Sequence, residues 1–208
     1  MDYETRLLPH PYLAELEPRE LDSEGLGPTR LSPGYPAWNL LYYAILCSVD
    51  PDLDDIVVIE TGTNRGLSTI VMAAALKDLG ANARVRTVEL NPALSDAARS
   101  NVASAGLSDL VEFNVGDSHD FLRQVCAEVD HIDFAFLDAD HSAKHALGEF
   151  ELIHPKVVAR NGKVHFDNTS AGGVAKAVRL IKERYGGNLV QFDNCSWEPP
   201  GNAIWQPG

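Results

Sequence analysis

A short apolar run that leads directly into a glycine turn and a helix constrains this chain more than any other feature. Residues 56–59 (Ile-Val-Val-Ile) are apolar and mostly β-branched, which is typical of a buried parallel strand. Glu60 follows at the predicted strand end, and Gly62 and Gly66 bracket the turn. This order predicts the first half of a βαβ unit, with a ligand site at the carboxyl edge of a sheet. The helix is expected over 70–79, opened by Ser68 and closed by Gly80.

The spacing of the glycines argues against a dinucleotide. A G-x-G-x-x-G fingerprint starting at Gly62 would place its other glycines where Asn64 and Leu67 stand. The carboxylate of Glu60 would repel a phosphate and attract a ligand with a cationic head. S-adenosylmethionine has an ammonium, a sulfonium and no phosphate. The glycines alone are equally compatible with a purely structural βα turn.

Composition narrows the class of protein further. A chain of 208 residues with 45% hydrophobic residues suits one globular domain. The net charge of −13 disfavours nucleic acid and anionic membranes as partners. No apolar run approaches a membrane span, and no signal peptide is visible. Three scattered cysteines (Cys47, Cys126 and Cys195) indicate reduced thiols, so a cytoplasmic protein is expected.

The order of the predicted elements indicates a doubly wound α/β sheet. Residues 1–37 are rich in proline and are expected to form an irregular N-terminal arm over a single domain, 38–208. Pro155 is expected to kink or end the helix that contains it. Further strands are predicted over 84–90, 110–116, 132–137 and 162–166, with a terminal hairpin of 188–194 and 202–206. Further helices are predicted over 38–49, from Pro92 to Gly106, from Asp117 onward, and over 142–159 and 172–185.

Polar side chains follow several of these strands. Glu89 ends the second strand, where a carboxylate can accept both ribose hydroxyls of an adenosine. Asp117, Ser118 and His119 follow the third strand and could hydrogen-bond an adenine edge, although helix N-cap residues would look the same.

Three motifs in order give the chain a specific resemblance. They are Glu60-Thr-Gly-Thr-Asn-Arg-Gly-Leu-Ser-Thr69, Phe136-Leu-Asp-Ala-Asp140 and Phe166-Asp-Asn168. Over residues 38–206 the chain resembles class I S-adenosylmethionine-dependent methyltransferases, and within them the metal-dependent O-methyltransferases of the catechol and caffeoyl-CoA type. The resemblance implies a Rossmann-like, mostly parallel seven-stranded sheet whose last strand is antiparallel. It also implies methyl transfer to a hydroxyl of a small molecule.

The resemblance also assigns site residues. Asp138 would contact the cofactor's ammonium, Glu89 the ribose, and the Asp117–His119 segment would border the adenine. Asp138, Asp167 and Asn168 would hold a divalent cation, because carboxylate and amide oxygens suit Mg²⁺, Mn²⁺ or Ca²⁺. Alternatively, Asp167 and Asn168 would only cap the helix that follows them. The methionine end would be held by Glu60, Gly62, Thr63, Asn64, Gly66 and Ser68.

One position departs from the family pattern. Where the metal-dependent enzymes usually carry a lysine as general base, this chain has His141. A histidine with an unperturbed pKa of about 6.5 could deprotonate a hydroxyl near neutrality. We therefore predict that His141 is the catalytic base, beside Asp138. His145 shares its helix face, and His165 is expected to pack or support a ligand rather than react.

Other classes of protein remain open at this point. Related methyltransferases with a similar Asp-x-Asp-His segment need no metal. A non-catalytic nucleotide-binding domain would keep the turn, and a nicotinamide oxidoreductase would need the missing fingerprint. Tyr35, Trp38 and Trp197 are candidates for a lid over the acceptor. The sequence identifies neither the acceptor nor the oligomeric state, with a homodimer among the options.

Overall fold

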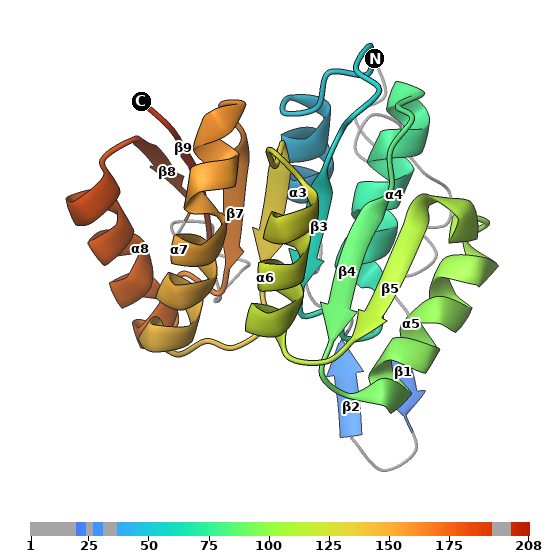
Figure 1. Cartoon of the computed structure of the whole chain (residues 1–208). Helices are drawn as coiled ribbons and strands as arrows, with labels where there is room; N and C mark the ends of the chain where they lie inside the picture. Colours follow the sequence, from blue (N-terminus) through green and yellow to red (C-terminus); the bar gives the residue numbers. More distant parts are fainter. Residues whose placement is uncertain (1–19, 24–26, 31–36, 193–200) are drawn as a thin grey trace, which may run out of the picture.

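The computed structural model describes residues 20–23, 27–30, 37–192 and 201–208. A seven-stranded sheet in the order β5-β4-β3-β6-β7-β9-β8 forms its centre (Figure 1). Strands β3 to β7 run parallel, and β9 is antiparallel to both β7 and β8. The predicted sheet with its antiparallel last strand is confirmed. The strands are β3 (Val58–Thr61), β4 (Val85–Glu89), β5 (Val111–Val115), β6 (Phe134–Leu137), β7 (Lys163–Asp167), β8 (Asn188–Gln191) and β9 (Asn202–Gln206).

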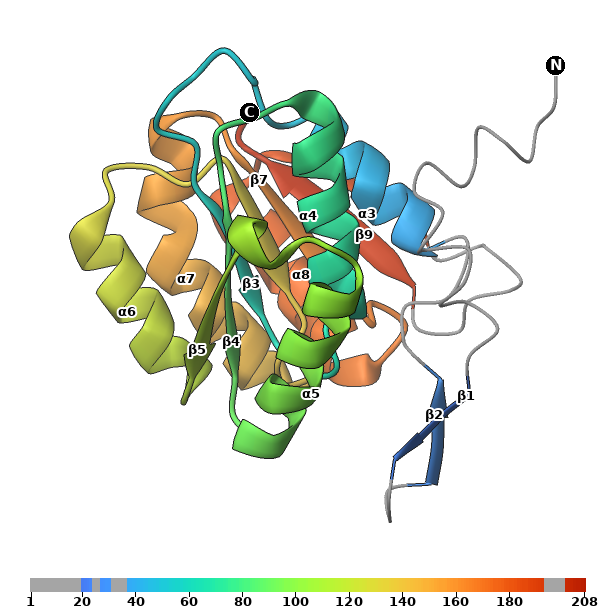
Figure 2. The same ribbon diagram turned by 90° about the vertical axis from the view of Figure 1, so that its right-hand side faces the viewer.

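Helices cover both faces of the sheet (Figure 2). Side chains of α3, α4 and α5 form one apolar cluster with one face of the sheet, and those of α6, α7 and α8 form the other. Residues 67–76 of α4 are all buried, as expected of a helix that is apolar around its circumference. The helices are α3 (Ala37–Leu46), α4 (Leu67–Leu79), α5 (Pro92–Ser104), α6 (Ser118–Glu128), α7 (Ala143–Ala159) and α8 (Gly172–Tyr185), with a short 3₁₀ helix, η1 (Ser108–Leu110).

Three local expectations need correction. β3 begins at Val58, so Glu60 lies inside the strand rather than at its end. Pro155 does not end its helix: α7 runs through it to Ala159, because Ile153 and Val157 on either side of the proline are buried and hold the helix against the core. The N-terminal arm is not wholly irregular: β1 (Glu20–Ser23) and β2 (Gly27–Arg30) pair as an antiparallel two-stranded sheet. The rest of the arm, Tyr35 and Trp197 lie outside the described residues, and Trp38 is described only as part of α3.

None of the helices in the described ranges is long and apolar enough to cross a membrane.

Candidate active site at the carboxyl edge of the sheet

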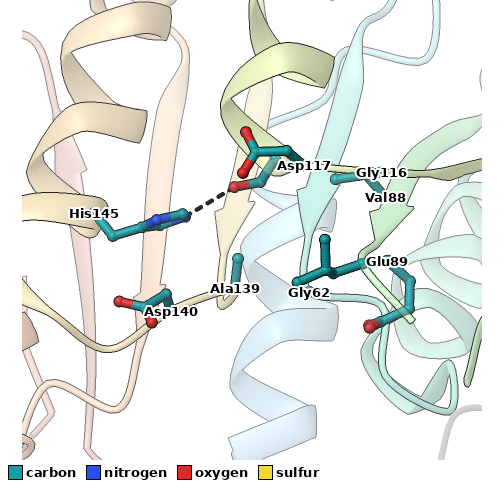
Figure 3. Close-up of a pocket in the computed structure, with 10 residues that line it drawn as sticks. Gly62, Val88, Glu89, Gly116, Asp117, Ala139, Asp140 and His145 are labelled. Atoms are coloured by element: carbon teal, nitrogen blue, oxygen red, sulfur yellow. Dashed lines mark hydrogen bonds between the residues drawn. The ribbon is translucent and has the colours of Figure 1, made fainter.

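A cavity of ≈ 330 Å³ opens at the carboxyl ends of the central strands (Figure 3). Glu89 stands at one end of it and His145 at the other, with Gly62 and Ala139 between them. Of the side chains that the sequence assigned to a ligand, the structure brings Glu89, Asp117 and Ser118 together here. The full lining is Gly62, Val88, Glu89, Leu90, Gly116, Asp117, Ser118, Ala139, Asp140 and His145.

The glycine turn lies hard against the end of β6. Gly62 has a φ of 84°, and a Cβ added there would lie 2.2 Å from the carbonyl oxygen of Asp138. The backbone N–H groups of Gly62 and Thr63 both donate to the carbonyl of Val88, at 3.0 and 3.2 Å. Only glycine permits this approach, so the turn brings its backbone to the edge of the cavity. Gly66, with a φ of 85°, precedes α4 at its N-cap.

The carboxylate of Glu89 is fixed by backbone donors. Its Oε2 accepts from the N–H of Asn64 at 2.7 Å, and its Oε1 accepts from the N–H of Asn91 at 2.9 Å. Each carboxylate oxygen has a second lone pair. The group is therefore preorganised to accept two further hydrogen bonds from a ligand in the cavity.

Glu60 occupies a different position from the one expected. It is fully buried beneath the turn, where Ser68 and Thr69 donate hydroxyl hydrogen bonds of 2.5 Å to its two oxygens. Burial raises its pKa to about 7, against the lowering effect of these hydrogen bonds. Thr63 is likewise enclosed, with its hydroxyl 2.5 Å from that of Thr87. The side chains of Glu60, Thr63 and Ser68 thus shape the turn from below and do not line the cavity.

The wall expected to border an adenine is also a helix cap. Oδ1 of Asp117 accepts from the N–H groups of His119 and Asp120 at 2.9 and 3.1 Å. Asp117 and Ser118 line the cavity at the same time. His119 does not line it; its ring packs edge-on against that of His145, with centroids 4.2 Å apart. The two interpretations of the Asp117–Ser118 segment are therefore compatible.

The three residues proposed for a metal meet at the ends of β6 and β7. Asn168 donates from Nδ2 to Oδ1 of Asp138 at 2.9 Å, and its backbone N–H donates to Oδ1 of Asp167 at 2.8 Å. Burial raises the pKa of Asp138, whereas hydrogen bonds from His141 and Asn168 lower it. In kind these oxygens suit a hard divalent cation, although Asn168 turns its amide nitrogen rather than its oxygen toward Asp138. Within the described residues, no group of three or more His, Cys, Asp or Glu is arranged to hold a metal.

His141 is tied to the same acid. Its Nε2 lies 3.3 Å from Oδ1 of Asp138, and its side chain is about half exposed. The hydrogen bond to Asp138 raises the pKa of His141 above its ordinary value. His165 packs as expected: it is fully buried, its Nε2 lies 2.7 Å from Oδ1 of Asn202, and burial lowers its pKa to about 4.

Sequence reasoning did not assign His145 to the cavity. Nε2 of His145 lies 2.9 Å from the hydroxyl of Ser118 and 3.4 Å from Oε1 of Glu149. The spacing of His145 and Glu149, one helical turn apart, was the available signal. Val88, Leu90, Gly116, Ala139 and Asp140 were also missed. The glycine, alanine and aliphatic residues among them have no chemical signature in a sequence, whereas Asp140 stood in the quoted motif after the fourth strand and was given no ligand role.

The sheet order, the glycine turn and the acid at the end of β4 together define a Rossmann-like methyltransferase fold. The chain belongs to the methyltransferase domain family, whose model matches residues 59–169.

Individual proteins are similar over shorter or more divergent stretches. Catechol O-methyltransferase B from Danio rerio is 32% identical over 154 residues, which is 73% of this chain and 54% of the relative. A catechol O-methyltransferase from Mycobacterium tuberculosis is 33% identical over 116 residues, covering 56% of this chain and 49% of the relative. The chain thus spans about half the length of the curated relatives it matches.

Solved structures agree in fold. The O-methyltransferase TomG from Streptomyces achromogenes, in complex with SAM, has a TM-score of 0.74 at 21% identity, covering 99% of this chain and 95% of that one. An O-methyltransferase from Bacillus cereus, in complex with SAH, has a TM-score of 0.68 at 23% identity, covering 95% and 90%. At this identity the likeness concerns the fold.

Proposed function

We propose that this protein is an S-adenosylmethionine-dependent O-methyltransferase that methylates a hydroxyl of a small molecule with the help of a divalent cation. The observation that carries the proposal is the carboxylate of Glu89, held by two backbone N–H groups at the end of the cavity. Its free lone pairs suit the two hydroxyls of a ribose. The glycine turn beside it has no phosphate fingerprint.

The rest of the cavity supports an adenosine followed by a methionine. Ser118 and Asp117 border the side away from Glu89, where a base would lie. The turn backbone from Gly62 to Gly66 and the acid Asp138 lie where the cationic methionine end would pass. Two of the similar solved structures are of O-methyltransferases in complex with SAM or SAH. Asn64 and Gly66 belong to the glycine turn, so we propose that they contact the ligand through their backbone atoms.

The acceptor would bind beside Asp138, Asp167 and Asn168. These three residues would hold the cation, which supplies charge that lowers the pKa of an acceptor hydroxyl. His141, on the same acid, would take the hydroxyl proton when its imidazole is neutral. Catechol is the first acceptor to test, because several relatives are named catechol O-methyltransferases. A metal-independent methyltransferase with the same fold is the second candidate, favoured by the hydrogen bond that already joins Asn168 to Asp138.

Calorimetry tests the proposal directly. The protein should bind S-adenosylmethionine and S-adenosylhomocysteine but not NADH. Losing charge-assisted hydrogen bonds costs roughly 1.5–3 kcal/mol, so Glu89→Ala should weaken binding about tenfold or more. Glu183→Ala, an exposed acid on α8, is the matched control. Unchanged affinity in a folded Glu89→Ala variant would remove the ribose assignment, and binding of NADH alone would overturn the class.

A further inference from the structure

His145 lines the cavity, and the proposed reaction gives it no role. It projects from the first turn of α7, lines the cavity opposite Glu89, and is about one-fifth exposed (Figure 3). Its Nε2 faces two partners, the hydroxyl of Ser118 at 2.9 Å and Oε1 of Glu149 at 3.4 Å. Ser118 lies on the cavity wall, whereas Glu149 is buried behind it.

The position of the proton on His145 determines what Ser118 offers to a ligand. Within the described part of the chain, the Ser118 hydroxyl has no other side-chain partner. If Nε2 carries a proton, it donates to the oxygen of Ser118, and the hydroxyl hydrogen is free to point into the cavity. If Nε2 is bare, the hydroxyl donates to it, and the cavity meets only an acceptor oxygen.

Glu149 favours the arrangement in which Nε2 of His145 carries a proton and the Ser118 hydroxyl hydrogen is free to point into the cavity. It is 1% exposed, and among the described residues its Oε1 has no hydrogen-bond partner, so the positive charge of a protonated His145, whose Nε2 lies 3.4 Å away, is what stabilises it while the Nε2 proton is donated to Ser118. A buried carboxylate without a cationic or donating partner is costly. The other charged groups that face His145 are Asp140 before α7 and Asp117 at the start of α6, together with the ring of His119. Both acids also favour a protonated imidazole, and the pKa of His145 is raised, chiefly by Glu149.

We propose that His145 is a positioning residue, held protonated at Nε2 by Glu149, which turns the Ser118 hydroxyl into a donor for a ring nitrogen of the ligand's base. This inference rests on the proposed function, because it takes the base to be adenine. Adenine has acceptor nitrogens at N1, N3 and N7. The same geometry makes recognition of the base pH-dependent where the imidazolium gives up the proton at Nε2, because the bare nitrogen then accepts from the Ser118 hydroxyl and turns it away from the base.

Binding of S-adenosylhomocysteine and its 1-, 3- and 7-deaza analogues, measured by calorimetry, tests the donor. A neutral hydrogen bond corresponds to roughly three- to tenfold in affinity. In the wild-type protein below the His145 pKa, one of the three analogues should bind about that much more weakly than the parent. In Ser118→Ala all four ligands should bind alike. Equal binding of the three analogues in the wild type would overturn the donor role.

The pH dependence separates positioning from a merely structural role. Wild-type affinity for S-adenosylhomocysteine should fall as the pH rises through the His145 pKa. His145→Gln places an amide N–H where Nε2 stood, so it should keep the affinity at low pH and lose the pH dependence. Glu149→Gln should move the transition to lower pH. Glu151→Gln, an exposed acid on the same helix, is the control and should leave the transition in place.

A measurement without ligand helps to distinguish failure of the proposed function from failure of the role proposed for His145. Nuclear magnetic resonance should give a lower pKa for His145 in Glu149→Gln than in the wild type and in Glu151→Gln. If none of the four ligands binds the wild-type protein, the proposed function falls, and the role of His145 with it. If they bind with the same pH profile in the wild type, His145→Gln and Glu149→Gln, only the role of His145 is overturned.

Discussion

Asn168 donates from its side-chain amide to Oδ1 of Asp138 across 2.9 Å, which joins the carboxyl ends of β7 and β6. The backbone φ of Asn168 is 57°, a left-handed conformation that asparagine tolerates better than most residues. The backbone N–H of Asn168 donates a hydrogen bond to Oδ1 of Asp167. One residue thus links both carboxylates of the proposed cation site.

The first prediction concerns that cation. Turnover with S-adenosylmethionine and catechol should be lost after exhaustive chelation and restored by Mg²⁺, Mn²⁺ or Ca²⁺. Asp167→Ala should lower the rate far more than it weakens cofactor binding, whereas Asp138→Ala should lower both, because only Asp138 is assigned to both. Electron paramagnetic resonance of added Mn²⁺ gives a readout that does not depend on turnover. Full activity of the chelated enzyme would leave a metal-independent methyltransferase.

The second prediction concerns His141. The Asp138 carboxylate stabilises its protonated form, so its neutral, basic form dominates only above a pKa that is higher than the ordinary 6.5. The rate should therefore rise with pH and level off above that value. His141→Phe should flatten the profile and reduce the rate about 10²-fold or more.

His154→Phe is the control for this profile. His154 lies on the same helix but among Phe150, Tyr185 and Trp205, so an aromatic substitution there should leave the profile intact. A wild-type rate and profile in His141→Phe would make His141 a structural partner of Asp138.

The fold could be predicted from the sequence, but the exact residues at which its strands begin could not. Strand-and-turn chemistry is local, so the glycine turn, the N-cap at Asp117 and the acid at Glu89 were all predictable. The start of β3 was not, because pairing of Val58 with Val85 and Phe134 determines it, and the apolar run extends two residues further back. Pairing is a tertiary property that hydrophobic pattern does not specify.

Tertiary packing also decides which histidine reaches the cavity, and the hydrophobic pattern does not specify it. His141 and His145 stand four positions apart, so helical periodicity predicts a shared face, but α7 begins at Ala143 after its N-cap Ser142, so His141 precedes the helix and the predicted shared face is wrong. Which one reaches the cavity depends on how α7 packs against α6, where Ser118 and His119 receive His145. Burial of Glu60 was missed for a related cause. An acid after an apolar strand suggests a ligand, and only the enclosing hydroxyls of Ser68 and Thr69 show that it supports the turn.

The third prediction follows from the buried Glu60. Its folded pKa, about 7, is above its ordinary 4.5. The folded state therefore binds more protons between these values, so this group's contribution is fully present below 4.5 and is lost as the pH rises through 7. The rise corresponds to about 3 kcal/mol in the free energy of unfolding.

Glu60→Gln should remove that pH dependence. The carboxamide keeps the shape of the protonated acid and its hydroxyl partners. Urea unfolding at pH 5 and pH 8 should show a smaller loss of stability in Glu60→Gln than in the wild type. Glu183→Gln, on the surface of α8, should behave as wild type. Equal pH dependence in all three proteins would mean that Glu60 is ionised throughout.

The fourth prediction separates backbone strain from close approach at the glycine turn. Gly62 and Gly80 both have positive φ values, 84° and 69°, so an alanine at either position incurs a left-handed backbone cost of about 1–2 kcal/mol. At Gly80 a Cβ meets nothing within 4 Å, whereas at Gly62 it would lie 2.2 Å from the carbonyl oxygen of Asp138. That oxygen belongs to backbone and cannot rotate away.

Gly62→Ala should therefore destabilise the protein by clearly more than Gly80→Ala in urea unfolding. It should also weaken S-adenosylhomocysteine binding, because the turn must move away from the end of β6. Gly80→Ala should leave binding unchanged, since it lies at the far end of α4. Similar losses of stability in the two variants, with binding intact in both, would show that the turn has room to yield at Gly62.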